Sequence, residues 1–249
     1  MTSSGQLKRK SFSEMKTAAV MQPYVFPYLG YFQLIAASDV FIFYDDVNFI
    51  KQGWINRNRI LVQGKETMIT FPCKKISSFS KINEVELLAN DKPFRKILKS
   101  IEQSYSKSSQ FQQVYPVIEE IFNHRGNTIA DFAMSSITTI ARFLGMNQKF
   151  LVSSRDFSSY EHFDRADRLI AMCQSLDCNR YINSIGGQDL YDRSYFKQSG
   201  IELQFLKPEL KPYFQLNRSD FAPGMSIIDV LMNCSVKEVN KMLGGYELE

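Results

Sequence analysis

Cysteine and histidine are scarce in this sequence, and their spacing does not suit a metal site. Cys73, Cys173, Cys178 and Cys234 form no C-x-x-C pair, and no histidine lies at ligand spacing from any of them. A structural zinc site and a disulfide framework are therefore disfavoured, and the thiols suit a reducing cytosol. We expect a cytoplasmic protein with no bound cofactor and no metal ligand among its candidate site residues.

The signatures of several large protein classes are also absent. The chain has no Walker loop, no G-x-G-x-x-G after its first apolar run and no H-E-x-x-H. No apolar run approaches the roughly 20 residues of a membrane span. The net charge of +4 is mild and forms no dense basic stripe. The sequence therefore predicts neither a membrane span nor a DNA-binding surface.

The composition is that of a globular protein. A chain of 249 residues, 44% of them hydrophobic and 22% charged, can bury a sizeable core in one domain. Residues 1–14 are polar and basic and lack the apolar stretch of a secretory signal, so they predict a disordered tail. Residues 15–249 are predicted to form a single α/β domain.

The order of the predicted elements indicates a parallel sheet. Apolar runs at residues 17–21 and 39–44 predict strands, and residues 31–38 between them predict a helix, which makes a βαβ unit. Further strands are predicted at residues 82–88, 150–152, 180–182 and 201–206, and a hairpin at 60–71. Helices are predicted at residues 94–105, 115–123, 128–144, 167–176, 190–198, 226–234 and 236–243. We expect a Rossmann-like, mostly parallel sheet with a central helical insertion or lid at residues 93–145.

Polar and aromatic residues are densest between residues 22 and 59. Two loops there follow neighbouring predicted strands, and open α/β sheets bind ligands at the carboxyl ends of their strands. We therefore expect the two loops to share a pocket, with Gln22 and Tyr24 from the first and Asp45 and Asp46 from the second. The residues that follow add an amine, guanidinium groups and amides for acid–base and anion-binding chemistry: Lys51, Trp54, Asn56, Arg57, Asn58 and Arg59.

A structural interpretation of this segment stays open. An Asp-Asp pair after a strand is often a turn or a helix cap, and Arg57 and Arg59 alternate as solvated strand residues do.

A second group of residues follows the predicted strand at 180–182. Asn183 is followed by Gly186 and Gly187, and glycines before a helix free backbone amides that can receive a phosphate or a carboxylate. The alternative is a plain turn that needs glycine for its backbone angles. Residues 153–156 form a weaker candidate of the same kind.

Several of these motifs together resemble the WbqC-like protein family. The resemblance covers about residue 15 to the C-terminus, and it is carried by residues 21–24, 30–32, 44–47, 51, 53–59, 181–183, 186–187, 190–191 and 226–231. Members of that family are associated with O-antigen gene clusters, and a glycine transferase role has been suggested for some. Many carry a histidine where this chain has Gln22, which implies that Gln22 binds or orients a ligand.

The resemblance implies a transferase that adds glycine or another small acyl group to an amino sugar on a nucleotide. Such chemistry needs a base for the amine and donors for the oxyanion. The candidate catalytic residues are Asp45, Asp46 and Lys51. The candidate binding residues are Gln22, Tyr24, Trp54, Asn56, Arg57, Asn58, Arg59, Asn183, Gly186 and Gly187. The expected partners are the nucleotide-linked amino sugar and an activated acyl donor, which is a carrier-protein thioester, a coenzyme A thioester or an aminoacyl-tRNA.

Two other functions fit the same residues. A strand, a Pro/Gly loop, a helix and an Asp-ended strand also resemble the start of nucleotidyltransferase-like enzymes, although these carry paired histidines in the first loop and this chain does not. A non-catalytic carbohydrate- or partner-binding module would use the aromatic residues, which make up 13% of the chain and cluster near the first loop.

Overall fold

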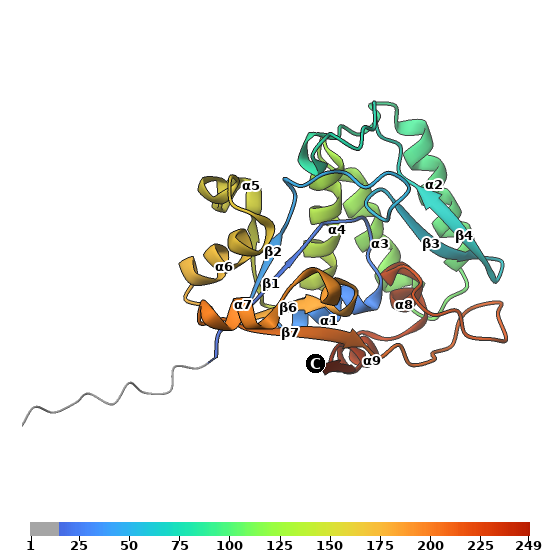
Figure 1. The fold of residues 1–249 in the computed structure, drawn as a ribbon. Helices are drawn as coiled ribbons and strands as arrows, with labels where there is room; N and C mark the ends of the chain where they lie inside the picture. The colour runs from blue at the N-terminus through green and yellow to red at the C-terminus, as the bar shows by residue number, and fades with distance from the viewer. Residues whose placement is uncertain (1–14) are drawn as a thin grey trace, which may run out of the picture.

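The computed structural model describes residues 15–249, so the predicted tail lies outside the described residues. A six-stranded sheet in the order β5-β2-β1-β6-β7-β8 runs through its centre (Figure 1). The strands are β1 (Thr17–Met21), β2 (Val40–Phe43), β5 (Lys149–Val152), β6 (Arg180–Ser184), β7 (Glu202–Pro208) and β8 (Tyr246–Leu248). The first five are parallel, and β8 is antiparallel to β7. The prediction of a Rossmann-like, mostly parallel α/β sheet is confirmed.

Helices cover both faces of this sheet, which explains why β1 after Thr17 and the whole of β2 are apolar. On one face Ala19, Phe41 and Phe43 share a core with helices α1 (Leu29–Ala36), α2 (Asp91–Tyr105), α3 (Phe111–Asn123), α4 (Ile129–Phe143), α8 (Ile227–Asn233) and α9 (Val236–Leu243). On the other face Val20 and Ile42 pack with α6 (Arg165–Ser175) and α7 (Arg193–Gln198). The result is three layers, with the sheet in the middle.

A long excursion separates the neighbouring strands β2 and β5. It contains the antiparallel hairpin β3 (Arg57–Val62) and β4 (Lys65–Thr70), the short 3-10 helix η1 (Ile82–Glu84), and then α2, α3 and α4. The hairpin turn is two residues long, and both have positive φ, +50° at Gln63 and +76° at Gly64. The three helices confirm the predicted central insertion, and its action as a lid stays a prediction.

Two segments differ from the sequence-based expectation. The strand predicted at residues 82–88 is wrong, because Ile82 begins η1 and only isolated bridges follow, from Leu87 to Cys73 and from Glu86 to Thr128. These bridges hold one segment to two different neighbours, and no ladder forms. The helix predicted at residues 190–198 begins later, because Asp192 caps α7 by accepting a hydrogen bond from Ser194 N, and η3 (Ile185–Leu190) precedes it.

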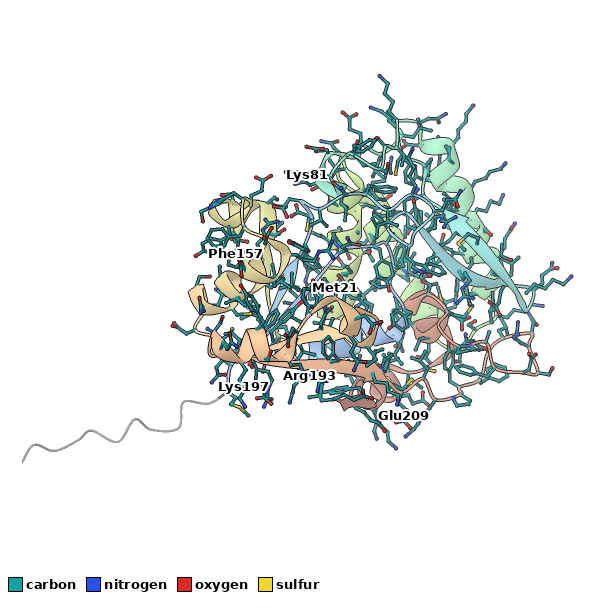
Figure 2. The ribbon with its side chains drawn as sticks, viewed as in Figure 1. Met21, Lys81, Phe157, Arg193, Lys197 and Glu209 are labelled. Atoms are coloured by element: carbon teal, nitrogen blue, oxygen red, sulfur yellow. The ribbon has the colours of Figure 1, made fainter. Side chains whose placement is uncertain are left out.

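The strand order defines where a ligand is expected to bind. The chain builds β1, β2 and β5 in one direction and then returns to the other side of β1 to add β6 and β7. Ligands of such sheets bind at this reversal, beyond the carboxyl ends of the strands. Met21 ends β1 near the middle of the molecule, so this edge is central (Figure 2). Across residues 15–249 no helix combines the length and the apolar character needed to cross a bilayer.

Candidate functional site

A pocket of about 320 Å³ lies beside the loop that follows β1. Its lining residues are Tyr24, Tyr28, Trp54, Asn58, Arg59 and Gly224. Two tyrosines come from the loop after β1, two residues come from β3, and the glycine comes from the loop before α8. The volume lies at the lower end of the range for small-molecule sites, and rings with a few polar groups are their usual lining.

Arg59 lies against the ring of Trp54 in this pocket. The guanidinium carbon is 5.4 Å from the ring centroid, a cation–π arrangement. Arg59 Nη1 donates to Glu66 Oε2 at 2.8 Å, which fixes the side chain. Arg59 Nε is buried and has no hydrogen-bond partner within residues 15–249. Trp54 is 48% exposed, so the pair presents both an aromatic face and a cation to an incoming ligand.

Asn58 supports the loop as well as lining the pocket. Its Nδ2 donates to Val25 O at 3.2 Å and to Phe26 O at 2.5 Å. Phe26 has a φ of +49°, which is rare for a bulky residue. Its carbonyl also accepts from Ser226 Oγ at 2.9 Å, and its N–H donates to Ser136 Oγ at 3.1 Å. Three distant elements therefore hold one residue in a strained conformation, as happens at functional sites.

Both tyrosines of the pocket are held in the protonated form. Burial raises the pKa of Tyr24 well above its ordinary value, and the neighbouring Tyr28 raises it further. Burial also raises the pKa of Tyr28. A phenol is protonated at neutral pH even at its ordinary pKa of about 10, so each O–H can donate a hydrogen bond to a developing negative charge, and burial keeps it protonated at higher pH.

Asp45 does not line this pocket. It is 2% exposed and accepts hydrogen bonds from Ser154 N at 3.0 Å and Ser154 Oγ at 2.7 Å. Ser153 Oγ lies 3.0 Å from Asp45 Oδ1 and 2.5 Å from Asp46 Oδ1. Both serines begin the short helix α5 (Ser153–Asp156) directly after β5. Because β5 pairs with β2, the carboxylates after β2 turn toward α5 rather than toward Tyr24.

Asp46 forms a buried ion pair with a residue of α6. Its Oδ2 lies 2.5 Å from Arg168 Nη2, and the side chains are 4% and 5% exposed. The Arg168 guanidinium lies 5.0 Å from the centroid of the Tyr44 ring. This network links the carboxyl ends of β2 and β5 to α6.

The other predicted site residues are spread around the same end of the sheet. Gln22 is half-buried after β1, and Lys51 and Gly186 are exposed. Two side chains hold the backbone instead: Asn56 Nδ2 donates to Phe71 O at 3.0 Å, and Arg57 Nε donates to Gly53 O at 3.0 Å. Asn183 packs against Gly187 so closely that a Cβ there would lie 2.5 Å from Asn183 Nδ2. That contact accounts for the glycine without a ligand.

The structure thus brings together only part of the predicted site. Tyr24, Trp54, Asn58 and Arg59 meet in one pocket, while Asp45 and Asp46 belong to a separate buried network. Sequence reasoning missed Tyr28, which counted only as one of the aromatic residues near the first loop, and Gly224, which follows Pro223 and indicated only a turn. It also missed Arg168, which has the helical context of an ordinary solvated arginine. Within residues 15–249 no group of three His, Cys, Asp or Glu side chains is placed to hold a metal ion.

Comparison with known proteins places this sequence in a family. The WbqC-like protein family matches residues 22–241. The chain belongs to this family. It is also similar to the uncharacterized protein Rv1507c of Mycobacterium tuberculosis (strain ATCC 25618 / H37Rv), with 29% identity over 223 residues, which cover 88% of this chain and 94% of that protein. No solved structure matches the chain. The matched range of this WbqC-like protein contains every residue of the pocket.

Proposed function

We propose that this WbqC-like protein is a transferase that adds glycine or another small acyl group to an amino sugar carried on a nucleotide. The proposed setting is the synthesis of O-antigen or another surface polysaccharide, which is what the family resemblance implies. The observation that supports it best is the pocket in which Arg59 lies over Trp54 beside two protonated tyrosines.

The chemistry of this pocket suits a nucleotide sugar. The exposed Trp54 face can stack on a nucleobase or a sugar ring. Arg59 is fixed by Glu66, and a guanidinium of fixed orientation suits a diphosphate. Lys51 lies three residues before Trp54 on an exposed turn and adds a second cation.

The proposed reaction is direct attack by the sugar amine on the donor carbonyl. A nitrogen–carbon bond forms, the bond from the carbonyl carbon to the donor's leaving group breaks, and the amine loses one proton. The Tyr24 and Tyr28 hydroxyls are the candidate donors to the tetrahedral oxyanion. Asp45 and Asp46, the candidate bases, lie outside this pocket in a buried network, so we propose that the departing group carries away the amine proton.

Calorimetric titration with UDP-linked amino sugars and their unsubstituted sugar counterparts tests the binding step. We expect saturable binding that Trp54→Ala weakens about tenfold, since stacking on an aromatic side chain contributes about 1–3 kcal/mol per base. Met68→Ala is the matched control, because Met68 is a similarly exposed apolar side chain on β4 and does not line the pocket. Equal affinity of the Trp54→Ala variant and the wild type would remove the pocket from the proposal.

A nucleotide-handling enzyme is the second candidate, and the strand order favours it. The reversal between β1 and β6 is the place where doubly wound sheets bind nucleotides. Release of pyrophosphate from ATP or CTP on incubation with the protein would support this candidate. Binding of sugar nucleotides without any turnover would instead favour a carbohydrate-binding module.

A further inference from the structure

Two loops next to the pocket expose large apolar side chains. They are residues 47–56, the later part of the connection between β2 and β3, and residues 72–83, which follow β4 and end inside η1. Ile50 is 54% exposed, Trp54 48% and Phe79 89%. We define the basic–apolar edge as these three residues together with Lys51 and Lys75, both of which are exposed.

The two loops lie side by side. Asn48 and Lys81 form an antiparallel bridge, Phe49 N donates to Ser80 O at 2.8 Å, and Ile82 N donates to Val47 O at 2.9 Å. Continuing this register places Ile50 opposite Phe79. Lys81 lies near one rim of the molecule and Glu209 near the opposite rim (Figure 2). The pairing of the two loops therefore brings Ile50 and Phe79 together on the surface.

The turn at residues 50–54 connects this edge to the pocket. Gly53 N donates to Ile50 O at 3.0 Å, and Arg57 N donates to Trp54 O at 3.1 Å, so the turn is compact. Trp54 belongs both to the edge and to the pocket lining. Any surface that covers the edge therefore also meets the mouth of the pocket.

Lysines outnumber the carboxylates that lie beside this edge. Residues 47–56 and 72–83 contain four lysines, and the neighbouring carboxylates are those of Glu84, Glu86 and Glu161. Lys74 pairs with Glu86 and Lys81 with Glu161, both from outside the loops, whereas Lys51 and Lys75 make no ion pair with a carboxylate of residues 15–249. Two unpaired lysines beside exposed Phe and Trp side chains form the composition that binds to the interface of an anionic bilayer.

We propose that the basic–apolar edge docks this protein on the surface of a lipid bilayer that contains anionic lipids. Phe79 and Ile50 enter the boundary between headgroups and acyl chains, and Lys51 and Lys75 contact the lipid phosphates. Docking of this kind turns the mouth of the pocket toward the membrane interface. The inference goes beyond the proposed transferase activity and does not depend on it.

Co-sedimentation of the full chain with vesicles tests this inference. The probes are phosphatidylcholine vesicles with and without phosphatidylglycerol. We expect binding only when phosphatidylglycerol is present, and weaker binding as salt screens the lysines. Lys75→Glu is expected to weaken binding at least about fivefold, since one lysine near an anionic surface contributes about that factor. Phe79→Ser is expected to weaken it about tenfold or more, by loss of a buried phenyl ring.

Matched controls come from surfaces away from this edge. Phe214→Ser removes a side chain that is 71% exposed, and Lys197→Glu reverses an exposed charge on α7, so both are expected to bind like the wild type. All four positions are on the surface, and circular dichroism verifies that each variant is folded. The inference is overturned if the protein does not sediment with phosphatidylglycerol vesicles, or if Phe79→Ser binds as well as Phe214→Ser.

Discussion

Breaking the ion pair between Asp46 and Arg168 is expected to destabilise the protein strongly. The side chains are 4% and 5% exposed, and Asp46 Oδ2 and Arg168 Nη2 are 2.5 Å apart. Removing one member of a buried pair leaves the other charge uncompensated, which costs about 3–5 kcal/mol. For a domain of this size each kcal/mol lowers Tm by about 2–4 °C, so Asp46→Asn is expected to lower Tm by about 6–20 °C.

Urea denaturation followed by circular dichroism measures this loss. Arg168→Met is expected to lose a similar amount, and the double variant Asp46→Asn/Arg168→Met to lose much less than the sum, because neither charge then remains alone. Glu247→Gln is the control, since its pair with Lys207 is 72% and 55% exposed and contributes about 1 kcal/mol or less. A loss below about 1 kcal/mol in Asp46→Asn, or additive losses in the double variant, would refute the structural role of this pair.

Three further variants address the pocket and its supports. Gly224→Ala is expected to lower the free energy of unfolding by about 1–2 kcal/mol, because φ is +66° at this position, and urea denaturation measures the loss. Arg59 is expected to keep its place, since the new Cβ would lie 3.6 Å from Arg59 Nη2. Asn58→Ala is expected to cost about 1–3 kcal/mol and to speed hydrogen exchange of the Phe26 amide, because the Phe26 carbonyl loses its shortest hydrogen bond. Burial raises the pKa of the Asp229 carboxyl group above its ordinary value of 3.8. Between 3.8 and the raised value the folded state keeps a proton on Asp229 that the unfolded state has lost, so the free energy of unfolding falls as pH rises through this range. Asp229→Asn is expected to remove that slope from urea curves measured across this pH range, and an unchanged slope would contradict the assignment.

The sequence predicts the sheet well because its strands carry a strong local signal. The runs at β1 and β2 are apolar on both faces, and the helix between them requires parallel pairing, so a Rossmann-like order follows. Residues 82–88 also carry buried apolar side chains, yet they make only isolated bridges to neighbours that are distant in sequence. Long-range pairing of this kind leaves no local pattern.

The pocket is only partly predictable for a similar reason. Tyr24, Trp54, Asn58 and Arg59 lie close in sequence, and they meet because β3 lies beside the loop after β1. Gly224 reaches the pocket through the loop before α8, far along the chain. Asp45 and Asp46 face α5 and α6 because β5 pairs with β2, and that pairing joins strands more than 100 residues apart.

Mass spectrometry of a UDP-linked amino sugar, incubated with the protein and a glycyl thioester, tests the proposed function most directly. The account predicts a glycylated sugar nucleotide in the wild-type reaction and a much smaller yield with Arg59→Ala, whose loss removes the cation over Trp54. Arg180→Ala is the matched control, because Arg180 is the first residue of β6 and does not line the pocket. This variant is expected to give the wild-type yield. If the mass of the sugar nucleotide stays unchanged with coenzyme A, carrier-protein and aminoacyl-tRNA donors alike, the protein is not the transferase that we propose.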